Sequence, residues 1–313
     1  MRLASISVDL DEIPNYFGIY GLPEPRGPER YAVYDIALDR LSAFAKSAAV
    51  PLTLFAIGRD LDRPESAARL RRAADAGYEI SNHTLDHRYD FVRLGRQEIA
   101  RQVDVGRTRI REATGATPTG FRAPGYTITD EVFDVLVELG VGYDSSVFPC
   151  PAYWGAKTVA IGWIAMRGRT SRSVMDWPSV LLAPTRPYRV GAPYWRRASR
   201  KPGEHGLLEL PVQVTRGLRL PFFGTSVTVA GPERARWLAK MCVGEPFVNL
   251  ELHGLDVLDG TDGLEALRPH QHDLRVPWGR KVQALHAVVE VLRAAGYAFV
   301  TMAEGAKELR SSL

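Results

Sequence analysis

The stretch Ala4-Ser5-Ile6-Ser7-Val8-Asp9-Leu10-Asp11 opens the chain and decides the fold. Its apolar side chains occupy every second position, which is the pattern of a β-strand. Apolar residues at helical spacing follow over residues 36–48, and an apolar run follows over residues 52–57. This order predicts a strand, a helix and a second strand, which is the repeating unit of a parallel sheet.

The same alternation continues to the end of the chain. Further strands are expected over residues 78–81, 120–122, from 143 onward, and over 207–214, 247–252 and 298–301. Further helices are expected over residues 67–76, 99–114 (with Gly115 as its stop), 129–140 (with Thr129 as N-cap and Gly140 after its end), from 232 onward, and over 281–295. About seven such units can close into a barrel, and an open doubly wound sheet is the alternative.

Length and composition favour one large α/β domain. The chain has 313 residues, a net charge of +4 and an ordinary apolar content. No apolar run reaches the roughly 18 residues of a membrane span, and Asp9 interrupts the opening segment too early for a signal peptide, so a cytoplasmic location is expected. Cys150 and Cys242 lie far apart, which favours buried thiols over a disulfide or a thiolate metal site.

Residues 151–202 interrupt the alternation. Tryptophans and arginines crowd this segment, and Asp176 is its only acid. Such a basic, aromatic insertion suits a lipid phosphate or a membrane surface, with Arg196, Arg197, Arg200 and Lys201 as candidate phosphate contacts. The alternative is a segment that packs beside the barrel and exposes its arginines to water. No nucleic acid is expected, because no nucleic-acid-binding motif is present.

Candidate metal ligands stand near two of the predicted strands. Asp9 and Asp11 are two apart, so in an extended chain both point to one face. His83 and His87 are four apart, and one helical turn or a tight loop would direct both rings at one ion. A carboxylate and two imidazoles leave positions open for water and substrate, as in catalytic sites, and the spare aspartate could then deprotonate that water.

Four of the polar residues follow predicted strands directly. Asp9, His83, Arg122 and His253 each stand at the carboxyl end of such a strand. Barrel and open-sheet enzymes both place their chemistry at this rim. The four motifs, although scattered along the chain, are therefore expected to converge.

These motifs together resemble those of the polysaccharide deacetylases, which form carbohydrate esterase family 4 with the nodulation-factor deacetylase homology domain. The resemblance rests, in order, on an Asp-x-Asp opening (9–11), a His-x-x-x-His motif (83–87), Arg122-Ala123-Pro124-Gly125-Tyr126, and Leu250-Glu251-Leu252-His253. It extends from about residue 2 to residue 305, with the insertion as its least matched part. The resemblance implies a distorted (β/α)7 barrel and one divalent ion, first zinc, with cobalt, nickel, manganese or iron as alternatives.

The resemblance also implies roles for individual residues. Asp11, His83 and His87 would bind the metal, Asp9 would be the general base, and His253 the general acid. Arg122 would orient Asp9, and the substrate would meet the loop that carries Pro124, Gly125 and Tyr126. Because the opening motif is Asp-x-Asp, as in one subgroup of the family, the two aspartates could exchange roles. The acid that tunes His253 is Asp256 or Asp144, since a sharp turn at Gly254 would fold Asp256 back.

The leading functional hypothesis is metal-dependent N-deacetylation of an acetylated amino sugar in a cell-envelope glycan or its lipid-linked precursor, with peripheral membrane contact. Lipid-linked formamido-sugar deformylases share the Asp-x-Asp opening, so deformylation is a close alternative. A non-haem iron oxygenase uses the same ligand types. A catalytically silent sugar-binding barrel is a further alternative. The sequence does not define the oligomeric state.

Overall fold

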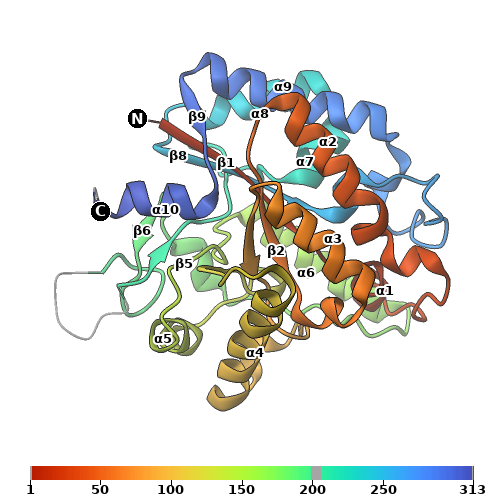
Figure 1. The fold of residues 1–313 in the computed structure, drawn as a ribbon, viewed down its shortest axis with the longest axis horizontal. Helices are drawn as coiled ribbons and strands as arrows, with labels where there is room; N and C mark the ends of the chain where they lie inside the picture. Colours follow the sequence, from red (N-terminus) through yellow and green to blue (C-terminus); the bar gives the residue numbers. More distant parts are fainter. Residues whose placement is uncertain (1, 199–205, 312) are drawn as a thin grey trace.

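The computed structural model describes residues 2–198, 206–311 and 313, and these build one curled sheet wrapped by helices (Figure 1). The sheet has nine strands in the order β6-β7-β5-β4-β3-β2-β1-β8, with β9 paired to β1. Their bounds are Arg2–Asp9 (β1), Thr53–Ala56 (β2), Glu79–Asn82 (β3), Gly120–Phe121 (β4), Tyr143–Asp144 (β5), Tyr188–Arg189 (β6), Leu208–Glu209 (β7), Phe247–His253 (β8) and Tyr297–Phe299 (β9). Every pair is parallel except β6 with β7.

The sheet curls so far that its two ends are linked. After β7 the chain continues beside β5, where the Val212 amide donates to Val147, and Val214 then pairs with Pro221. A last bridge joins Phe223 to Glu251 of β8. The result is a distorted α/β barrel, which confirms the predicted fold class.

Alternation along β1 separates a polar interior from an apolar outer layer. Ala4, Ile6 and Val8 are fully or almost fully buried in the main core cluster, together with side chains of the surrounding helices. The intervening positions carry polar side chains, and in the β1–β8 register Ser7 lies opposite Glu251 and Asp9 opposite His253. The inside of the barrel beneath the rim is therefore hydrophilic.

The helices in the described residues begin and end close to the predicted limits in most cases. They are Ile13–Ile19 (α1), Leu38–Ala48 (α2), Pro64–Asp75 (α3), Arg96–Thr114 (α4), Asp130–Glu138 (α5), Pro151–Met166 (α6), Gly224–Ala230 (α7), Pro232–Cys242 (α8), Trp278–Ala294 (α9) and Met302–Arg310 (α10). The Thr129 side chain accepts a hydrogen bond from the Val132 amide, so the predicted N-cap is present. Gly115 and Gly140 adopt positive φ angles of 79° and 66° after their helices.

The sequence-based elements were wrong in several places. The predicted strand 207–214 is regular only over Leu208–Glu209, because the chain after it turns into a hairpin closed between Thr215 and Leu220. The predicted strand 298–301 stops at Phe299, because Thr301 caps α10. Four helices were not predicted, namely α1, α6, α7 and α10.

The predicted insertion is not one surface. Its first part forms α6, and its second part forms β6 at the edge of the sheet, where Arg189 donates to the carbonyl of Arg310 in α10. Arg196 and Arg197 belong to this second part, because Arg197 bridges Val190 next to β6. Arg200 and Lys201 lie outside the described residues. Cys150 and Cys242 are buried free thiols.

One helix approaches the sheet so closely that only glycine fits. A Cβ on Gly106 of α4 would lie 2.8 Å from the carbonyl carbon of Thr84 and 2.9 Å from the amide nitrogen of Leu85. These are backbone atoms of the loop that contains His83 and His87, so the loop or the helix would have to move.

We therefore expect Gly106→Ala to lower the melting temperature despite the better helix propensity of alanine. Overpacking costs about 1–3 kcal/mol, against a gain of about 1 kcal/mol from propensity. Gly279→Ala in α9 is the matched control, because a Cβ there meets no atom within 4 Å. Thermal denaturation of both variants measures the difference, and equal stabilisation of the two would contradict this close packing.

Candidate active site

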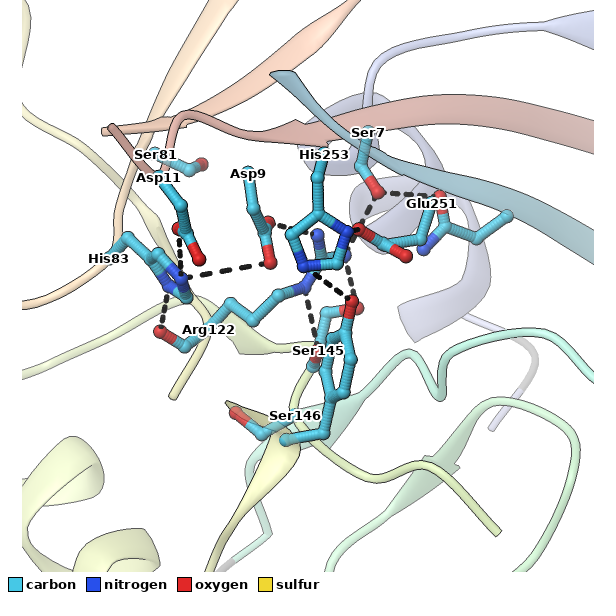
Figure 2. A network of polar contacts seen from close by, with 12 residues as sticks. Ser7, Asp9, Asp11, Ser81, His83, Arg122, Ser145, Ser146, Glu251 and His253 are labelled. Atoms are coloured by element: carbon cyan, nitrogen blue, oxygen red, sulfur yellow. Dashed lines mark hydrogen bonds and ion pairs between the residues drawn. The ribbon is translucent and has the colours of Figure 1, made fainter. Parts of the chain in front are cut away.

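The strand ends bring the predicted residues together at one rim. Asp9 and His253 are the last residues of β1 and β8 and stand in register. His83 and Arg122 directly follow the neighbouring strands β3 and β4. Figure 2 shows their side chains directed toward a common centre.

Asp11, His83 and His87 form a buried cluster with the geometry of a metal-ligand set. Asp11 Oδ1 lies 3.3 Å from His83 Nε2, and Asp11 Oδ2 lies 3.2 Å from His87 Nε2. One ligand atom from each residue lies within 4.8 Å of the other two. All three side chains are at most 5% exposed.

The ligand atoms of this cluster that lack a hydrogen-bond partner suit a divalent cation. His83 Nδ1 lies 2.7 Å from the carbonyl oxygen of Arg122, so Nδ1 donates there and Nε2 keeps its lone pair. Among the described residues, Asp11 Oδ1 and both ring nitrogens of His87 make no well-formed hydrogen bond, although they are buried. Unsatisfied buried acceptors that converge on one point are what a metal would satisfy.

Electrostatics gives Asp11 and His87 the protonation states that a metal site requires. Burial lowers the pKa of His87, which favours the neutral imidazole. Burial alone would raise the pKa of Asp11, but His87 and His83 hold it well below its usual range. Burial alone would lower the pKa of His83, but Asp9 and Asp11 raise it. A cation would replace the proton that these two carboxylates attract to His83.

The loop between the histidines is strained and firmly held. Thr84 and His87 have positive φ angles of 68° and 50°, which are rare for residues other than glycine. The Thr84 hydroxyl accepts from the His87 amide at 3.0 Å, and the Asn82 side chain donates to the Val103 carbonyl at 2.8 Å. The two histidines therefore meet through a tight loop rather than through a helical turn.

Asp9 lies between the metal-ligand cluster and Arg122. Its Oδ1 accepts from Arg122 Nη1 at 2.6 Å, while its Oδ2 lies 3.7 Å from His83 Nε2. Arg122 is fully buried and also donates to Ser7 and Ser145. This pairing fixes the orientation of the Asp9 carboxylate.

His253 is positioned by an acid that the sequence reasoning did not assign. Its Nδ1 lies 3.3 Å from Glu251 Oε1 and 3.9 Å from Asp256 Oδ2, and the latter oxygen accepts from the His253 backbone amide at 2.8 Å. Burial alone would lower the pKa of His253, but Glu251, followed by Asp11, Asp9 and Asp256, raises it to about 9. Strand alternation was the available signal, since residues 251 and 253 share a face of β8.

Asp144 has a different environment from the one predicted. Its carboxylate accepts from the backbone amide and the hydroxyl of Ser146, at 3.0 and 2.8 Å, and it contacts Glu209. The hydroxyl of Ser146 in turn accepts from the Ala123 amide. Asp144 therefore supports the loop after Arg122 instead of contacting His253, which corrects its predicted role.

The loop with Pro124, Gly125 and Tyr126 covers the His253 side of the site. The Tyr126 hydroxyl lies 3.4 Å from His253 Nε2. Gly125 has a φ of 64°, and its carbonyl accepts from Lys157 Nζ of α6 at 3.0 Å. Pro124 is buried, and its carbonyl accepts from the Thr127 hydroxyl. Of the three, only Tyr126 has a side-chain atom next to the proposed acid.

Comparisons with known proteins agree with this geometry. Residues 35–143 match the family model described as polysaccharide deacetylase, a range that contains His83, His87 and Arg122. A peptidoglycan deacetylase from Helicobacter pylori is 24% identical over 150 residues, which is 46% of this chain and 49% of the relative, so the match spans about half of that protein.

Two solved structures share the fold. A putative polysaccharide deacetylase from Mycobacterium smegmatis superposes with a TM-score of 0.62 and 17% identity, covering 99% of this chain and 90% of the other. A CE4 family pseudoenzyme from Bacillus anthracis superposes with a TM-score of 0.50 and 13% identity, covering 97% and 64%. The fold therefore does not by itself establish activity.

We expect one divalent ion per chain, and expect His83→Ala and His87→Ala to lose it. Each change removes one of the three candidate ligands of this cluster. Elemental analysis of the purified proteins measures the stoichiometry. His286→Ala on α9 is the matched control, because His286 belongs to neither group of described residues that could hold an ion, whereas Asp9, Glu251 and His253 form the second such group. Metal at wild-type stoichiometry in both ligand variants would exclude this site.

Proposed function

We propose that this chain, whose residues 35–143 match the polysaccharide deacetylase family model, hydrolyses the N-acetyl group of an amino sugar in a cell-envelope glycan or in its lipid-linked precursor. The observation that carries this proposal is the convergence of three candidate metal ligands, a carboxylate paired with Arg122, and a histidine at one rim. Zinc is the first candidate for the ion, because the donors are two imidazoles and one carboxylate. When bound, such an ion activates water and polarises the amide oxygen.

The residues divide the proton transfers of amide hydrolysis between two sides of the site. Asp9 is the base that takes the proton of the attacking water, and Arg122 holds it in place at 2.6 Å. His253 is the acid that protonates the departing amine: its Nδ1 faces Glu251 at 3.3 Å, and its Nε2, on the Tyr126 side, is the donor toward the substrate. Tyr126 adds a hydroxyl beside that nitrogen.

The test of this function is mass spectrometry of products from soluble N-acetyl and N-formyl amino sugars incubated with metal-loaded protein. We expect loss of acetyl, whereas loss of formyl would identify a deformylase and added oxygen an iron oxygenase. Asp9→Asn should abolish turnover and keep the metal, and His253→Ala should lower the rate by roughly 10²- to 10⁴-fold. No turnover of amide substrates by the wild type would favour a silent sugar-binding barrel.

The pH dependence should report on Glu251. His253 acts in its protonated form, so kcat/KM falls as the pH rises through the pKa of His253, which lies near 9. Glu251→Gln removes the charge that raises this pKa most, and the alkaline limb should move to lower pH. Asp256→Asn is the matched control, with a smaller shift because its carboxylate is farther from Nδ1. An unchanged limb in Glu251→Gln would exclude Glu251 as the tuning acid.

A further inference from the structure

Helix α6 presents an apolar stripe to the outside of the molecule. Every member of the stripe is exposed, and the spacing of three and four residues places all of them on one side of the helix. The stripe consists of Ala152, Ala156, Val159, Trp163 and Met166. The exposed fractions are 73% for Val159, 52% for Trp163 and 74% for Met166. A helix on the surface of a globular protein normally presents charged and polar residues on its solvent-facing side.

The outer side of α6 is also free of charge. Lys157 is the only charged residue of the helix, and it points inward to the Gly125 carbonyl. Gly155 and Gly162 face open space, since a Cβ on either would meet no atom within 4 Å. An exposed apolar patch without charges indicates a surface that binds another protein or a membrane.

A basic pocket adjoins the carboxyl end of the stripe. It has a volume of about 350 Å³, and its polar lining includes Arg167, Arg169, His270 and His272. The Arg167 guanidinium lies 4.6 Å from the centre of the Trp163 ring, and His270 stacks on Tyr20 at 5.1 Å. No carboxylate lines this pocket, and Arg167 and Arg169 form no ion pair with a described carboxylate. Its charge is therefore left for an anion from outside the chain.

We propose that the outer side of α6 docks on an anionic lipid bilayer. The stripe enters the boundary between headgroups and acyl chains, and the basic pocket receives a lipid phosphate. In this proposal α6 lies along the bilayer surface with its exposed stripe toward the lipid. A second copy of the chain is a poorer occupant, because neither the stripe nor the pocket lining offers a carboxylate to neutralise Arg167 and Arg169.

The inner side of α6 connects this surface to the candidate active site. Lys157 contacts Gly125, and the Tyr153 ring packs edge-on against Tyr126 at 5.9 Å. Docking through α6 would therefore hold the loop above His253 next to the lipid surface. This consequence deepens the proposed function, on which it rests, by pointing to an amino sugar carried on a lipid phosphate. The docking itself does not depend on catalysis.

Vesicle flotation with the full chain tests the docking directly. We expect binding to vesicles of phosphatidylcholine and phosphatidylglycerol in equal parts, and weaker binding to pure phosphatidylcholine. Trp163→Glu should reduce binding by roughly tenfold or more, since it removes an inserted ring and adds a charge. Trp237→Glu on α8 is the matched control, because Trp237 is equally exposed at 52% and should bind as the wild type does.

The arginines separate the electrostatic part of the docking from the apolar part. Replacing Arg167 and Arg169 with glutamine should lower binding to the anionic vesicles by about fivefold per residue and leave binding to phosphatidylcholine unchanged. Absence of vesicle binding by the wild type, or equal loss in the Trp163 and Trp237 variants, would overturn the proposal. A dimer that dissociates on Trp163→Glu, without any vesicle binding, would show a second copy as the occupant. Flotation measures binding and not turnover. The docking can therefore be confirmed or overturned even if the protein does not hydrolyse the proposed substrate.

Discussion

The buried guanidinium of Arg122 is the interaction on which the rest of the site depends. Its three nitrogens donate to Asp9, Ser7 and both the carbonyl and the hydroxyl of Ser145, and it lies 4.1 Å from the centre of the Phe55 ring. The carbonyl of the same residue fixes the tautomer of His83. Arg122 thus orients the proposed base and a proposed metal ligand together. Without it Asp9 would be a buried charge lacking its partner, a state that costs about 3–5 kcal/mol.

The inside of the barrel holds more carboxylates than Arg122 can neutralise. Asp9, Asp144, Glu209 and Glu251 are all buried. Burial raises the pKa of Glu209 well above its usual value and that of Glu251 to about 7, and repulsion from Asp144 adds to the effect on Glu209. Burial and mutual repulsion therefore favour the protonated form of Glu209 inside the barrel, whereas Asp9 at the rim pairs directly with the guanidinium of Arg122.

The sequence allowed the rim to be predicted but not all of its contacts. Asp9, His83, Arg122 and His253 could be found because each follows a run of apolar residues that reads as a strand. Glu251 was overlooked, although alternation on β8 places it on the His253 face. Helix α6 was missed because its apolar residues lie on the exposed side as well as the buried one, so no amphipathic pattern marks it. The hairpin after β7 depends on contacts with β8, which local sequence does not encode.

The composition of residues 151–202 suggested a single basic surface. The segment instead forms two parts of the structure with different surroundings. The arginines near β6 belong to the sheet edge and α10, whereas Arg167 and Arg169 stand beside the apolar stripe of α6. Arg167 and Arg169 thus adjoin α6, whose inner side contacts the loop above His253. Burial lowers the pKa of Lys157 to about 8, so its contact with the Gly125 carbonyl is made by an ammonium group that burial disfavours. This hydrogen bond couples the position of α6 to that of the loop that carries Tyr126.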